Sequence, residues 1–124
     1  IYLSDDPAVI RKKIMRAVTD TGPTEPNSPV SEPVNNLFTL LSLVANAERV
    51  DFYKAAYADC SIRYGDLKKE LAEEVLHFVA PIQERIREIG ADDAYIRKVL
   101  AEGAEKARLS SAKTLREVRE IMGF

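Results

Sequence analysis

Apolar residues recur every three or four positions through most of this chain, which is the spacing of one face of an α-helix. The clearest case spans residues 66–89, where the apolar stripe consists of Leu67, Leu71, Val75, Phe78, Val79, Ile82, Ile86 and Ile89. Pro81 lies inside this segment and should kink the helix, because proline removes one backbone hydrogen bond. Gly90 is expected to end it.

Four other segments have helical spacing: residues 7–18, 33–47, 48–60, and a last one from 91–94 to about 122. In the first, Ile10, Ile14 and Val18 form the stripe, and Asp5 or Asp6 can cap the helix before Pro7. The second is apolar on nearly all sides, which predicts a buried helix. The third presents Val50, Tyr53 and Tyr57. The last has Asp92 or Asp93 as its cap and an inner face consisting of Ile96, Val99, Leu100, Ala104, Ala107, Ala112, Leu115, Val118 and Met122.

Prolines interrupt the helical pattern between the first two segments. Residues 21–33 contain Pro23, Pro26, Pro29 and Pro33, which exclude a regular helix or a central strand. We expect an extended or mobile loop there, and a turn at residues 61–65. No segment alternates as a strand does. The sequence therefore predicts an all-α bundle of about five helices that forms a single domain, residues 1–124.

The composition limits the classes of partner. Hydrophobic residues make up 46% and charged residues 31% of the chain, as in a globular domain. The net charge of −2 gives no overall nucleic-acid signature and no indication of a DNA partner. Cys60 is the only cysteine and His77 the only histidine, so neither an internal disulfide nor a complete zinc site is expected. The default prediction is a cytoplasmic protein without a membrane-spanning helix.

No pattern of catalytic residues stands out. His77 follows Glu70, Glu73 and Glu74 at helical spacing, which could form one edge of a metal site, but no second helix repeats the pattern. A solvated helix face with Glu70 and Glu74 paired to lysines is the simpler interpretation. No nucleophile pairs with His77, and no glycine-rich phosphate loop is present. We expect no catalysis, no metal and no cofactor in this chain alone.

Two basic clusters could contact an anionic partner. The first is residues 11–16, which ends at Arg16. The second, residues 62–69, holds Arg63, Tyr64, Lys68 and Lys69 at the predicted start of the helix over 66–89. Backbone N–H groups at a helix start favour phosphates, with Asp66 as the cap, and Tyr64 could stack on an unpaired base. Such runs are more often solvated faces, so these clusters are weak signals by themselves.

Four stretches carry a family resemblance: LSDDPAVIRKKIMRAVTD (3–20), PVNNLFTLLSLVA (33–45), YGDLKKELAEEVLHFVAPIQERI (64–86) and VLAEGAEKARLSSAKTLREVREIMGF (99–124). In order and over almost the whole chain, they resemble the C-terminal region of bacterial-type tryptophanyl-tRNA synthetases, which are class I aminoacyl-tRNA synthetases. The resemblance implies a parent enzyme, a homodimer, that activates tryptophan with ATP and Mg²⁺ and attaches it to tRNA(Trp). The Rossmann catalytic domain, with its HIGH and KMSKS motifs, is absent here. Together with the start at Ile1, this makes us expect a piece of a longer polypeptide.

The resemblance also assigns a role to two places in the chain. The family's anticodon-binding region matches the loop Asp20–Thr24, which includes Thr21 and Gly22, and the helix start Gly65, Asp66, Leu67, Lys68 and Lys69. Lys68 is the first candidate for an anticodon contact, and Arg16, Arg63 and Tyr64 are secondary candidates. The expected partners are tRNA(Trp) and the enzyme's own catalytic domain.

Two alternatives belong to other classes. The first is a pure protein-interaction bundle, whose exposed apolar face would lie on the first helix at Ile10 and Ile14. The second is a metal protein that uses His77 and the neighbouring glutamates.

Overall fold

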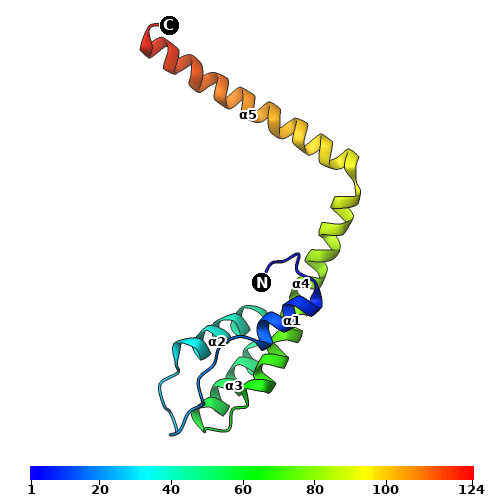
Figure 1. Cartoon of the computed structure of the whole chain (residues 1–124). Helices are drawn as coiled ribbons and strands as arrows, with labels where there is room; N and C mark the ends of the chain where they lie inside the picture. Colours follow the sequence, from blue (N-terminus) through cyan, green and yellow to red (C-terminus); the bar gives the residue numbers. More distant parts are fainter. The chain divides into compact units, whose positions relative to one another are not determined.

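The computed structural model describes all 124 residues. It contains five α-helices and no strand, which confirms the predicted all-α class. In chain order the helices are α1 (Pro7–Met15), α2 (Glu32–Val44), α3 (Ala47–Ala58), α4 (Tyr64–Ala91) and α5 (Asp93–Met122) (Figure 1). The chain divides into two compact units, Ile1–Gln83 and Glu84–Phe124. None of the helices combines the length and apolar content that a membrane crossing requires.

Helix α1 is shorter than the sequence predicted. Asp6 caps its start as expected, since its side chain accepts a hydrogen bond from the Ala8 N–H at 2.8 Å. The helix ends at Met15 with Arg16 as the C-cap, so the predicted continuation to Val18 is wrong. Val18 is 74% exposed, outside the core that Ile10 and Ile14 enter. The β-branched pair Val18–Thr19 disfavours another turn of helix.

The break between α2 and α3 lies at residues 45–46, slightly before the predicted boundary between residues 47 and 48. Helix α2 ends at Val44, and the side chain of Asn46 caps α3 by accepting from the Arg49 N–H at 3.0 Å. Val50, Tyr53 and Tyr57 of α3 are buried as expected. The expectation that α2 would be buried on nearly all sides is wrong, because Leu43 is 71% exposed.

Helix α4 extends beyond its predicted bounds at both ends. It begins at Tyr64, so Asp66 lies in its first turn instead of capping it, and the predicted turn at 61–65 is shorter. Gly90 does not end the helix, which continues through Pro81 and Gly90 to Ala91. The glycine that does end a helix is Gly123, whose left-handed conformation (φ +77°) follows α5.

The buried core lies entirely in the unit Ile1–Gln83, where α1, α2 and α3 pack against the first half of α4 (Figure 1). Helix α4 contributes Leu67, Leu71, Ala72, Val75 and Val79 to it. Its predicted stripe is therefore buried only in part; Phe78 is 49% and Ile86 47% exposed.

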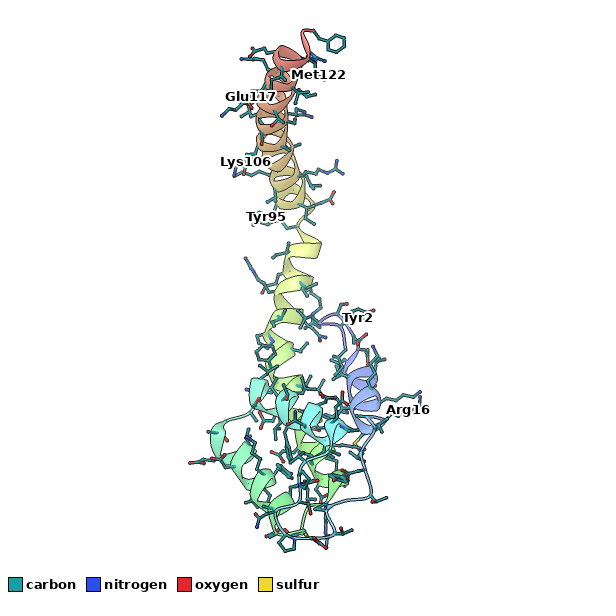
Figure 2. All side chains as sticks on the ribbon, turned by 90° about the vertical axis from the view of Figure 1, so that its left-hand side faces the viewer. Tyr2, Arg16, Tyr95, Lys106, Glu117 and Met122 are labelled. Atoms are coloured by element: carbon teal, nitrogen blue, oxygen red, sulfur yellow. The ribbon has the colours of Figure 1, made fainter.

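Helix α5 is capped by Asp92, as predicted, and its last residue is Met122. None of its residues is buried. The labelled side chains of Tyr95, Lys106, Glu117 and Met122 mark the length of this helix in Figure 2.

Candidate nucleic-acid interface

The loop after α1 lies against the start of α4, although the contacting residues are 44 and 49 positions apart in the sequence. The Tyr64 hydroxyl donates to Asp20 Oδ1 at 2.5 Å, and Lys68 Nζ donates to Thr19 Oγ1 at 3.4 Å. The loop, residues 17–31, contains no regular secondary structure, which confirms the prediction from the prolines for residues 21–31. The structure thus brings together the two places that the sequence had marked separately.

Asp20 is at the centre of this contact. Its Oδ1 also accepts from the Gly22 N–H at 2.8 Å, and its Oδ2 accepts from the Ser31 hydroxyl. The hydrogen bonds from Ser31 and Tyr64 lower the pKa of the Asp20 carboxyl below its ordinary value. Burial, together with the adjacent Asp20 carboxylate, raises the pKa of Tyr64. At neutral pH, an ionised carboxylate therefore accepts from a protonated phenol.

The basic residues around this contact differ in their surroundings. Lys68 is half-buried beside Thr19, whereas Arg63 and Lys69 are exposed. Lys69 Nζ lies 3.7 Å from Asp66 Oδ1, an exposed i,i+3 pair of little energetic weight. A Cβ added at Gly65 would have open space around it, so the helix backbone is accessible to a ligand on that side.

The loop side of the interface has a sharp turn. Gly22 has φ +101°, a conformation that side-chain-bearing residues rarely adopt. Thr21 beside it is exposed. Arg16 is exposed at the C-terminal end of α1, where Figure 2 labels it.

Sequence reasoning missed Thr19 and Ser31, which complete the contact. The Asp20-Thr21-Gly22 triplet was a usable signal for the turn at these residues, because an aspartate two residues before a glycine often accepts a hydrogen bond from that glycine's N–H. Ser31 gave no such signal: a serine just before a helix predicts a cap, but its side chain makes no capping hydrogen bond here.

The residues of the rival metal-site hypothesis have other partners. Glu70 and Glu74 both pair with Arg49 of α3, and Glu73 pairs with Arg11 of α1, so the expected pairing with lysines is wrong. His77 is exposed on α4. No group of three or more His, Cys, Asp or Glu side chains is placed to hold a metal ion.

The face expected for a protein-interaction bundle is also placed differently. Ile10 is fully buried and Ile14 is 2% exposed, so neither can dock a partner. The exposed apolar residues near α1 include Val9, Met15 and Val18. Val9 and Met15 lie off the predicted stripe, whereas Val18, which was predicted on it, lies beyond the C-cap of the helix.

The relatives of this chain are aminoacyl-tRNA ligases. The tryptophan–tRNA ligase of Porphyromonas gingivalis is 55% identical over 124 residues, which is all of this chain and 38% of the relative. Tryptophan–tRNA ligase 1 of Streptomyces coelicolor is 41% identical, and the tryptophan–tRNA ligase of Helicobacter pylori is 37% identical; each match covers all of this chain and 36% of the relative. No family model matches the chain.

The chain is therefore homologous over its whole length to part of the tryptophan–tRNA ligases, which confirms the predicted resemblance. It spans little more than a third of the length of these relatives.

Proposed function

We propose that this chain is the C-terminal, anticodon-binding part of an enzyme that activates tryptophan with ATP and attaches it to tRNA(Trp) in the cytoplasm. The observation that carries the proposal is the full-length match to ligases of that name, at up to 55% identity. In the proposed enzyme, ATP and Mg²⁺ bind in the remaining part of the polypeptide. The fragment itself recognises tRNA and carries out no chemistry.

The geometry around Lys68 supports an RNA-binding role. Proteins read RNA mainly in single-stranded loops, where splayed bases meet side chains held on a rigid scaffold. Lys68 projects from a helix whose neighbouring side chains Leu67 and Leu71 are fully buried. In the proposed site Lys68 is the principal contact, Arg63, Lys69 and Arg16 supply further positive charge, and the turn Asp20–Gly22 forms the opposite wall.

The exposed face of α5 supports a further partner, the catalytic part of the same enzyme. Val99, Leu100, Leu115 and Val118 are 43–66% exposed along this helix. Exposure of such an apolar stripe to water is unfavourable in free energy, and a stripe of this kind is typical of a surface that another element covers. We propose that both compact units belong to one helical domain of a homodimeric enzyme and that the catalytic part packs on this stripe.

The experiment that tests the proposal measures the affinity of the full-length protein for a tRNA(Trp) transcript and for one with a changed anticodon. Wild-type protein should bind the cognate transcript more tightly. Lys68→Ala should reduce this preference if Lys68 contacts a base, or weaken binding to both transcripts and lower the salt slope by about 1 if it contacts a phosphate.

Lys54→Ala provides the matched control, because Lys54 is an exposed lysine on another helix of the same unit, α3. It removes the same charge and should leave the preference unchanged. Equal binding of both transcripts by the wild-type protein, with no effect of Lys68→Ala, would refute anticodon recognition by this region.

A further inference from the structure

The Asp20 carboxylate holds together three separate parts of the fold. Its three donors are the Gly22 N–H in its own turn, the Ser31 hydroxyl at the start of α2 and the Tyr64 hydroxyl at the start of α4. Both carboxylate oxygens are engaged, and the residue is half-buried. A carboxylate in this state has little capacity left for a ligand.

Ser31 shows that this contact has priority over local helix stability. Serine is among the best N-cap residues, because its oxygen accepts from the free N–H groups of the first turn. Ser31 stands at the N-cap of α2 but makes no capping hydrogen bond, and its hydroxyl donates to Asp20 instead. The Ser31 side chain therefore stabilises the position of the loop instead of the first turn of α2.

The position of Lys68 depends on the same contact. Its Nζ reaches Thr19 Oγ1, and Thr19 directly precedes Asp20 in the chain. If Asp20 releases Tyr64, the Thr19 hydroxyl is no longer held beside α4, and the lysine side chain regains its freedom to rotate. Ordering such a side chain in advance reduces the entropy that binding must offset.

We propose that Asp20 is a positioning residue of the anticodon-binding site: it holds the turn 19–22 against the start of α4, and thereby orients Lys68, without itself bonding to RNA. The inference rests on the proposed function and goes beyond it, because it separates the residue that arranges the site from the residues that contact tRNA. The Tyr64 hydroxyl acts through Asp20 in the same way.

Four variants of the full-length protein test this inference: Asp20→Ala, Tyr64→Phe, the double variant, and Asp59→Ala as the control. Asp59 is matched because its carboxylate also accepts from a residue two positions later, the Ser61 N–H at 2.9 Å, and has no hydrogen bond to the loop 17–31. The neighbouring Ala58 carbonyl accepts from the Asn27 N–H of the loop, and this backbone bond is retained in the Asp59→Ala variant. Both alanine variants remove one negative charge, so any general gain in RNA affinity is shared. The quantity measured is the ratio of Kd for the changed-anticodon transcript to Kd for tRNA(Trp).

Asp20→Ala should reduce this ratio by about tenfold, since loss of a charged hydrogen-bonding partner costs on the order of one decade in an equilibrium constant. Tyr64→Phe retains both the ring and the carboxylate and should reduce it by about threefold. The double variant should be no worse than Asp20→Ala, because the two residues act as a unit. Asp59→Ala should leave the ratio unchanged.

Three outcomes would overturn the inference. If Asp20→Ala reduces the ratio while Tyr64→Phe does not, Asp20 acts on RNA directly. If neither variant changes the ratio but Lys68→Ala does, the proposed function stands and Asp20 has no positioning role. If the wild-type protein shows no preference and Lys68→Ala has no effect on binding, the proposed function fails, and this inference with it.

Discussion

Replacing Leu71 with alanine should remove a large part of the stability of the unit Ile1–Gln83. Leu71 is fully buried in α4 within the core formed by α1 to α4. Leu→Ala substitutions at such positions cost about 3–5 kcal/mol, since a cavity adds to the lost transfer free energy. A small domain has roughly 5–10 kcal/mol of stability in total. The variant should therefore lie close to its unfolding threshold at room temperature.

Leu100→Ala is the matched substitution in α5, where Leu100 is 66% exposed. It should change the free energy of unfolding by less than about 0.5 kcal/mol, as exposed positions generally do. Urea unfolding of the 124-residue chain can be followed by tyrosine fluorescence, because the chain has no tryptophan and Tyr53 and Tyr57 are buried in the same core. With an m-value of about 1–2 kcal/mol/M, the midpoint of Leu71→Ala should fall by roughly 1.5 M or more. A comparable fall for Leu100→Ala would refute the reasoning, because α5 would then contribute to the core.

Three further predictions follow from the same structure. Amide hydrogens of α5 should exchange much faster in the isolated chain than those of Leu67–Val79, since no side chain of α5 is buried; equal protection in a hydrogen-exchange experiment would contradict this. The ion pair between Arg11 and Glu73 joins two exposed side chains, so a double-mutant cycle should give a coupling energy below about 1 kcal/mol, and a larger value would show that the pair is desolvated. The Asp20 carboxyl has a lower pKa in the folded chain than its ordinary pKa of 3.8, so its ionised form stabilises the fold at higher pH, and this contribution is lost as the pH falls through the folded-state pKa. Asp20→Asn should therefore lose less stability than wild type between about pH 5 and 3. Parallel acid unfolding curves for the two proteins would contradict this prediction.

Helical spacing in the sequence predicted the elements well because each helix in the first unit has one face against a core. The stripe over 66–89 is buried at Leu67, Leu71, Val75 and Val79, as expected. Beyond Gln83 the same spacing continues, but the unit Glu84–Phe124 has no buried core of its own. Periodicity indicates which face of a helix is apolar, not which partner covers it, so burial beyond this point could not be predicted.

Helix ends were harder to predict because several residues could serve each role. Gly90 and Gly123 both resemble helix stops in the sequence, yet only Gly123 takes the left-handed conformation. Asp66 and Arg63 both precede apolar residues, and the helix begins between them at Tyr64. The candidate site was predictable in its basic residues, which charge alone marks. Its internal contacts, from Ser31 and Thr19, depend on how the loop folds back, which local sequence does not encode.

Hydrogen exchange of the full-length protein with and without tRNA(Trp) tests the central claim most directly. We predict that tRNA slows exchange in two segments, residues 19–22 and 63–69, and leaves the start of α3, residues 47–52, unchanged. Protection of both segments together would place the anticodon at the contact between the loop and α4. Protection of neither segment, with tRNA bound at saturation, would show that this part of the chain does not recognise tRNA.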